Sequence, residues 1–214
     1  MKNGLAFTSI INAEDFKPGV WDPFYYRACN AENKLSNYVE IRRGFSYRYP
    51  LSSFKFLPIE YKDIFPGNHL TFNLKLNDKV RTSERVNAVP EDTLLFGTMR
   101  AYLGNVIVTP KSSWLNEETV WFSTNSEFCE IIPLDGLKYF WLIFLKSMQF
   151  KNNLPTGTGG TRPRVNTDQL YQIPVIVPEL EERRKIDSEI KLIAEKMWVE
   201  QTLLSRIIER NSNV

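Results

Sequence analysis

A glycine-rich loop followed by arginines is the first part of this sequence whose residue types suggest chemistry. Three of the four residues 157–160 are glycine, and glycine lets the backbone take positive φ and approach a partner closely. Arg162 and Arg164 follow, and residues 151–166 contain no acid. The segment predicts a turn that faces an anion. It is not a nucleotide-binding P-loop, because the lysine and the Ser/Thr that would hold a β-phosphate and magnesium are missing.

A second basic segment, residues 41–56, interleaves cations with aromatic rings and contains no acid. Its cations are Arg42, Arg43, Arg48 and Lys55, and its rings are Phe45, Tyr47, Tyr49, Phe54 and Phe56. Guanidinium groups fork onto phosphate oxygens or base edges, so contact with a nucleic acid is one interpretation. The other is a solvated hairpin edge whose arginines keep the protein soluble.

Catalytic patterns are weak. Asp22-Pro23-Phe24-Tyr25 approaches the Asp/Asn-Pro-Pro-aromatic signature of amino-methyltransferases, but Phe24 replaces the second proline. No glycine-rich loop for S-adenosylmethionine follows a predicted strand. A nuclease would need a carboxylate cluster with a lysine at metal-site spacing, and the sequence has none. We therefore expect a chain without catalysis of its own.

Composition predicts one core with an appendage. The chain has 214 residues, of which 43% are hydrophobic, and its net charge of +2 is too small to indicate nucleic acid by itself. Cys29 and Cys129 lie far apart and His69 is the single histidine, so we expect neither a disulfide framework nor a metal site. No apolar run approaches the ~20 residues needed to cross a bilayer, and Met1 leads into no signal-peptide core. These features predict a cytoplasmic protein.

Several short strands must position the basic segments. Alternating patterns and apolar runs predict strands at residues 35–43, 55–61, 93–97, 106–109, 118–123 and 127–132, and a short buried strand at 173–177. A core helix is expected at residues 137–150, with Asp135 as its N-cap. One face of that helix carries apolar side chains and a serine, which favours core packing. The residues of this face are Phe140, Ile143, Phe144, Ser147 and Met148.

A long helix is predicted from Glu179 to Arg210, and at ~1.5 Å per residue it would span about 48 Å. Acids and bases are nearly balanced along it, so attraction to DNA would have to come from the preceding residues. Its apolar residues recur in alternating fours and threes, interrupted by Glu200, which predicts a seam for a partner helix. The seam residues are Ile186, Ile190, Ile193, Met197, Leu204 and Ile207.

Two ordered motifs resemble a known family. The first runs through Gly157-Thr158-Gly159-Gly160, Arg162-Pro163-Arg164-Val165-Asn166, Leu170, Ile173-Pro174 and Pro178-Glu179-Leu180-Glu181-Glu182. The second, earlier in the chain, is Leu94-Leu95-Phe96-Gly97-Thr98-Met99-Arg100-Ala101-Tyr102-Leu103-Gly104. Together they resemble the specificity (S) subunits of type I restriction-modification systems. The resemblance implies an α+β fold, in which a mixed, irregular β-sheet forms a target-recognition domain at residues 1–178. A conserved spacer and dimerisation helix of coiled-coil type would follow at 179–214.

The resemblance also implies a function. The chain would read a DNA half-site and dock methyltransferase (M) subunits, which bind S-adenosylmethionine and methylate adenine, and a restriction and motor (R) subunit could join them. Since S subunits usually carry two recognition domains and two spacer helices, this chain resembles half of one. Self-association through the helix would rebuild a two-domain reader, as a homodimer serving host defence.

The expected DNA contacts come from both basic segments and from the motif around Arg100. They are Arg42, Arg43, Tyr47, Arg48, Tyr49, Arg100, Tyr102, Thr158, Arg162, Arg164 and Asn166. For Arg100 an internal salt bridge is the competing role. Two other functions stay open: an enzyme, either a lone methyltransferase or a nuclease, and a dimerising scaffold of the same fold that no longer reads DNA.

Overall fold

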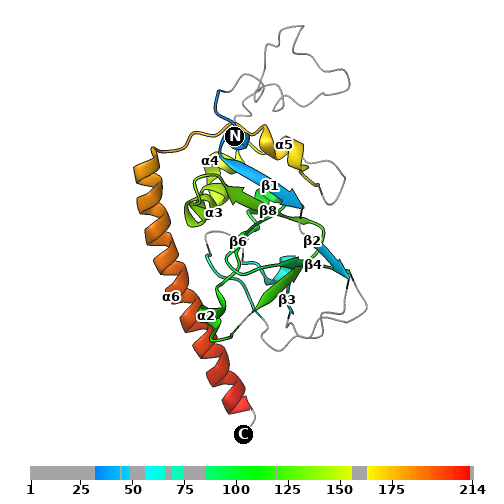
Figure 1. Cartoon of the computed structure of the whole chain (residues 1–214), viewed down its shortest axis with the longest axis vertical. Coiled ribbons are helices and arrows are strands. Elements are labelled where there is room, and N and C mark those ends of the chain that lie inside the picture. The colour runs from blue at the N-terminus through cyan, green and yellow to red at the C-terminus, as the bar shows by residue number, and fades with distance from the viewer. Residues whose placement is uncertain are drawn as a thin grey trace, which may run out of the picture.

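Two four-stranded sheets, several short helices and a long C-terminal helix make up the described part of the structure, a computed structural model (Figure 1). It describes residues 32–43, 45–48, 56–65, 69–74, 85–118, 120–155 and 163–212. All but one of the described strand pairs are antiparallel, and the long helix comes last, as in α+β folds. The α+β class predicted from the sequence is confirmed.

The first sheet is antiparallel throughout, with the strand order β1-β8-β5-β6. Its strands are β1 (Val39–Arg43), β8 (Phe128–Pro133), β5 (Leu94–Gly97) and β6 (Val106–Val108). β5 and β6 are buried along their whole length, which explains why their apolar runs show no alternation. The predictions at 93–97, 106–109 and 127–132 are confirmed within a residue or two.

The second sheet is mixed, with the order β2-β4-β7-β3. Its strands are β2 (Phe45–Arg48), β4 (Arg85–Val89), β7 (Trp121–Thr124) and β3 (Phe56–Ile59). β3 and β7 run parallel, and the other neighbours are antiparallel. β1 continues directly into β2, and β7 into β8, so the chain crosses between the sheets at both places. Because Arg43 pairs with Cys129, the two crossings lie side by side.

The other described elements are short helices and one long helix. The 3-10 turns are η2 (Leu35–Asn37), η3 (Tyr61–Asp63) and η4 (Ala101–Leu103). The α-helices are α2 (Ser112–Leu115), α3 (Lys138–Lys146), α4 (Met148–Lys151), α5 (Thr167–Tyr171) and α6 (Leu180–Ser212). α3 contacts β6 and β8. The largest fully buried side chains of the core include Phe72, Phe96, Phe122, Trp141, Phe150 and Trp198.

α6 confirms the predicted long helix, and it lies along the domain rather than standing away from it (Figure 1). Near its start, the Asp187 carboxylate accepts hydrogen bonds from the backbone N–H groups of Tyr139 (2.7 Å) and Phe140 (3.0 Å) in α3. Further along, Trp198 packs edge-on against Phe72, with ring centroids 4.9 Å apart. The last turns of α6 extend past α2 (Figure 1).

A buried ion pair adds to this docking. Arg183 of α6 binds the Asp135 carboxylate, and the two side chains are 11% and 13% exposed. The same guanidinium lies 5.7 Å from the Tyr38 ring centroid. Asp135 also accepts a hydrogen bond from the Leu137 N–H at 3.0 Å. The prediction that Asp135 is the N-cap is wrong, because the N-cap residue of α3 is Leu137. Asp135 instead accepts a hydrogen bond from the N–H of that cap residue.

Three sequence predictions of local structure need correction. The expected strand 35–43 begins with η2 and becomes a strand only at Val39. The expected helix 137–150 breaks at Ser147, whose ψ of 154° is extended, and this break leaves Met148 67% exposed rather than in the core. Residues 173–177 form an isolated bridge at Pro174 instead of a strand, because proline has no N–H to donate to a ladder.

Candidate nucleic-acid interface

A half-open cavity of about 420 Å³ forms where the two sheet crossings meet the segment that leads into α5. The end of β1, the residue after β5, the β7–β8 turn and residues 164–167 all contribute to its wall. The lining residues are Arg43, Thr98, Ser126, Glu127, Phe128, Cys129, Arg164, Val165, Asn166 and Thr167. The strands thus bring Arg43, Arg164 and Asn166 together, although Arg43 lies far from the other two in the sequence.

Arg164 is held by its neighbours on both backbone and side chain. Its backbone forms an antiparallel bridge with Met99, and the next N–H, of Val165, donates to the Thr98 carbonyl oxygen at 3.1 Å. Its guanidinium donates to the Glu127 carboxylate through Nε at 3.1 Å and also through the NH2 nitrogen. The hydrogen bond and negative charge of Glu127 raise the pKa of Arg164. The Arg164 side chain is nevertheless 55% exposed.

Glu127 is itself fixed through its backbone. Its carbonyl oxygen accepts hydrogen bonds from the Thr98 N–H (2.8 Å), the Thr98 hydroxyl (2.8 Å) and the Tyr61 hydroxyl (3.1 Å). Among the described residues, the second carboxylate oxygen of Glu127 is buried without a hydrogen-bond partner. Such a group costs about 1–3 kcal/mol, and unsatisfied groups of this kind tend to be retained at functional sites.

Tyr61 packs and hydrogen-bonds next to Glu127 and Thr98. Its ring stacks on Phe128 with centroids 4.7 Å apart, and its hydroxyl oxygen accepts a hydrogen bond from the Met99 N–H at 3.2 Å. Burial raises the pKa of Tyr61 well above its usual value, so the hydroxyl stays protonated and able to donate. A Cβ at Gly97 would lie 2.8 Å from Tyr61 atoms, so glycine is required here for Tyr61 to reach its partners.

Asn166 has a structural role as well as a place in the cavity wall. It is the N-cap of α5, where its side chain accepts a hydrogen bond from the Gln169 N–H at 2.7 Å. The Gln169 side chain in turn accepts one from the Asn166 N–H at 3.1 Å, which completes a capping box. α5 was not predicted, although Asn166 and Gln169 have the spacing of this motif.

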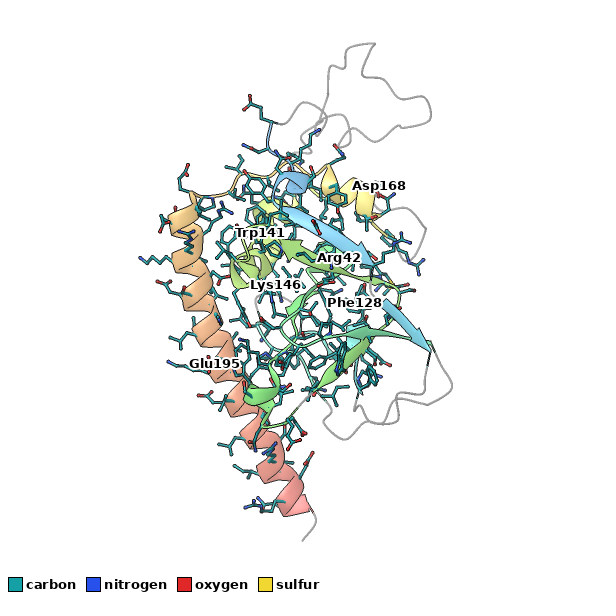
Figure 2. All side chains as sticks on the ribbon, viewed as in Figure 1. Arg42, Phe128, Trp141, Lys146, Asp168 and Glu195 are labelled. Carbon is teal, nitrogen blue, oxygen red and sulfur yellow. The ribbon has the colours of Figure 1, made fainter. Side chains whose placement is uncertain are left out.

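Other predicted contacts lie outside the cavity wall. Arg42 is exposed and pairs with Glu40 of its own strand at 3.3 Å, on the side of the molecule away from α6 (Figure 2). Arg100 is exposed and has a left-handed φ of 49°, and its N–H donates to the Pro163 carbonyl oxygen at 2.8 Å. Arg100 therefore lies beside the segment that carries Arg164. Tyr102 is 55% exposed in η4.

The remaining predicted contacts lie in β2 or outside the described residues. Tyr47 and Arg48 belong to β2, where their backbones pair with Val86 and Arg85 of β4. Tyr49, Thr158 and Arg162 lie outside the described residues. Sequence reasoning missed Glu127 and Tyr61, and it gave Thr98 no role although Thr98 lies in the second family motif. No local signal marks Glu127 or Tyr61, because each contributes through contacts with residues distant in the chain.

The seam residues of α6 divide into two groups. Ile186, Ile190 and Met197 are partly buried and pack against the core of the domain. Ile193, Leu204 and Ile207 are 46%, 58% and 48% exposed, and the interrupting Glu200 is exposed as well. The exposed group is flanked by Leu203 and Ile208, at 59% and 56% exposed. Cover of this group by a partner helix stays a prediction, as does the domain boundary at 178/179.

The described residues hold no cluster of His, Cys, Asp or Glu side chains that could bind a metal ion. No described helix is both long enough and apolar enough to cross a membrane.

The family model of the type I restriction modification DNA specificity domain matches residues 60–205, which is more than half of the chain. The chain belongs to this family. The match includes the Leu94–Gly104 motif, most of the cavity wall and much of α6. No curated protein matches the sequence.

Two solved structures are similar to the chain. One, titled for the complex assembly and conformational transition of the type I R-M system, has a TM-score of 0.46 and 16% identity over 84% of this chain and 43% of that chain. The other is the HsdS subunit from Thermoanaerobacter tengcongensis, with a TM-score of 0.40 and 16% identity over 81% of this chain and 38% of that chain. The chain spans less than half the length of both.

Proposed function

We propose that this chain is a DNA sequence-recognition component of a type I restriction-modification system that reads one half-site of the target. The observation that carries the proposal is the convergence of Arg43, Arg164 and Asn166 at one cavity, in a member of the specificity-domain family. Arginine offers a fork of donors to base edges and phosphates, and asparagine offers a donor and an acceptor. Neighbouring exposed arginines, Arg42 and Arg100, would position the domain on the DNA backbone.

The chemistry would belong to partner subunits. Methyltransferase (M) subunits would bind S-adenosylmethionine and transfer the methyl group to adenine N6, and a restriction and motor (R) subunit could join them. This chain would bind no cofactor and would dock the M subunits. The exposed apolar side chains of the C-terminal part of α6, Leu203, Leu204, Ile207 and Ile208, would pair two copies. The complex would act in the cytoplasm in host defence.

The proposal is tested by selecting bound sequences from a library of random DNA duplexes with the purified full chain. We expect a short enriched motif, together with an affinity that falls steeply as salt rises, because binding releases counterions from the phosphates. Arg43→Ala should weaken binding and reduce the salt slope by about one charge if Arg43 contacts phosphate. If the duplexes that the chain binds share no enriched motif, sequence recognition is refuted.

A dimerising scaffold that no longer reads DNA is the second candidate function. The exposed apolar part of α6 favours it, because this surface lies apart from the cavity and serves association whether or not DNA binds. A chain that self-associates in light scattering but binds all duplexes equally would support the scaffold. Methyl transfer by the purified chain supplied with S-adenosylmethionine would instead support an enzyme.

A further inference from the structure

The Glu127–Arg164 pair differs from an ordinary surface ion pair in how firmly it is built. The Glu127 side chain is 17% exposed, while that of Arg164 is 55% exposed, so an enclosed carboxylate holds a guanidinium that projects toward solvent. Thr98 holds the backbone beside each partner, since its N–H and hydroxyl donate to the Glu127 carbonyl oxygen and its own carbonyl oxygen accepts from the N–H of Val165, the residue after Arg164. A long side chain normally loses rotamer freedom when it binds a ligand. Here much of that freedom is already removed.

The charge of the pair limits what Arg164 can recognise. Arg164 and Glu127 together carry no net charge, and a phosphate placed at Arg164 would also be repelled by the neighbouring carboxylate. The two hydrogen bonds to Glu127 fix the direction of the guanidinium N–H groups. A neutral group with two adjacent acceptors fits this arrangement better than a phosphate does. In the major groove, guanine presents such a group with N7 and O6.

The contact geometry agrees with this choice. Glu127 engages Arg164 through Nε and the NH2 nitrogen, which is the side edge of the guanidinium. A bidentate contact to guanine uses the end edge formed by the two terminal nitrogens. A carboxylate on the side edge therefore sets the plane in which the end edge meets a base.

We propose that Glu127 is a positioning residue that aims Arg164 at the N7 and O6 atoms of one guanine in the target half-site. Thr98 and Tyr61 fix the Glu127 backbone, and Glu127 fixes the Arg164 side chain. This inference rests on the proposed DNA-reading function. It adds that one base of the half-site is guanine and that Arg164 contacts it.

The test compares the wild-type chain with Glu127→Gln on the motif selected by the wild type. Each guanine of that motif is replaced in turn by 7-deazaguanine, which lacks the N7 acceptor. We expect one position at which this replacement weakens wild-type binding about tenfold, within the range of a good bidentate contact. Glu127→Gln should lose most of its preference for guanine at that same position, while its salt slope stays unchanged because no phosphate contact is removed.

Glu181→Gln is the matched control, since Glu181 forms an exposed pair with Arg184 on α6, away from the cavity, and it should bind as the wild type does. Arg164→Gln, at an exposed side chain, must lose the same guanine preference even if Glu127→Gln folds poorly in thermal melts. Full guanine preference in either variant would overturn the inference, as would a uniform loss of affinity with a shallower salt slope. A wild-type selection without a motif would refute the proposed function itself.

Discussion

Lys146 is buried in the middle of the domain, where burial opposes its charge (Figure 2). Its side chain donates a hydrogen bond to the His69 carbonyl oxygen at 2.8 Å. Desolvation, with a smaller effect from Lys151, lowers the pKa of Lys146 to about 8 from 10.5. Between these two values the unfolded chain binds more protons than the folded one, so this residue makes stability rise with pH.

Lys146→Met should therefore remove a pH dependence. Relative to this variant, the wild-type free energy of unfolding should increase between about pH 8 and 10.5, by at most about 3 kcal/mol, and should be level below pH 8. Urea denaturation of both proteins across this range measures the difference. Lys191→Met, at an exposed position of α6, serves as the control with no such trend. A constant difference between wild type and Lys146→Met would contradict the burial argument.

Cys129 should be chemically silent in the folded protein, although it lies at the cavity wall. Its side chain is 2% exposed, and burial raises the pKa of its thiol to about 12, so very little thiolate exists at pH 8. In a chain with Cys29→Ser, we expect Ellman's reagent to label less than roughly a tenth of the native protein in the time that labels all of it in urea. Rapid labelling of the native state would show that the cavity opens to this depth.

At the scale of elements, α6 is part of the domain's structure because it caps another helix. The Asp187 carboxylate accepts from the N–H groups of Tyr139 and Phe140, which are orphan donors at the start of α3. Asp187→Ala should lower the free energy of unfolding by about 1–2 kcal/mol, as the loss of an N-cap does, with an unchanged denaturant slope.

Asp187→Asn, which keeps an acceptor, should be milder, and Glu189→Ala, at an exposed site two residues further along α6, should be nearly neutral. Chemical denaturation measures all three variants. Equal stability of Asp187→Ala and wild type would mean that α6 does not cap α3 in solution.

Elements with strong local signals were predictable from the sequence, whereas elements that depend on distant contacts were not. β5, β6 and β8 follow from apolar runs, and α6 follows from a long charged amphipathic pattern. β4, with its sequence RVNAV, lies in the polar region 65–92 that gave no assignment, and it becomes a strand by pairing with β2 and β7. The segment 173–177 has the apolar character of a strand. It forms only one bridge, between Pro174 and Lys34, because proline has no N–H to continue a ladder.

The candidate site shows the same division. Arg43, Arg164 and Asn166 were predicted because arginine clusters and a family motif mark them. Their convergence at one cavity, and the role of Glu127, depend on the pairing of β1 with β8 and on the bridge between Met99 and Arg164. Glu127 and Arg164 lie 37 positions apart, so neither composition nor spacing could connect them.

At the scale of the whole molecule, α6 has a covered part and an uncovered part with different consequences. The covered part holds the buried residues Ala194, Trp198 and Thr202, each at most 7% exposed, so α6 stays on its own domain. The C-terminal part exposes Leu203, Leu204, Ile207 and Ile208, although Arg206 on the same turns still donates to the Leu115 carbonyl oxygen of α2 at 2.8 Å. The 33 residues of α6 span about 50 Å at ~1.5 Å per residue. A second copy packed on this part would therefore hold two recognition domains at a fixed separation.

If two copies pair in this way, Leu204→Glu with Ile207→Glu should convert a dimer in light scattering into a monomer. Both side chains are about half exposed, so the circular dichroism spectrum and the melting temperature should change little. Binding to a duplex with one half-site should be retained, whereas the gain in affinity on a duplex with two half-sites should disappear, since that gain comes from linking two readers.

Leu134→Glu, at a leucine 60% exposed between β8 and α3, is the control and should remain dimeric. A dimer that persists in the double variant would place the contact elsewhere on the molecule, and a wild-type chain that is monomeric at micromolar concentration would leave the spacing of half-sites to a different partner.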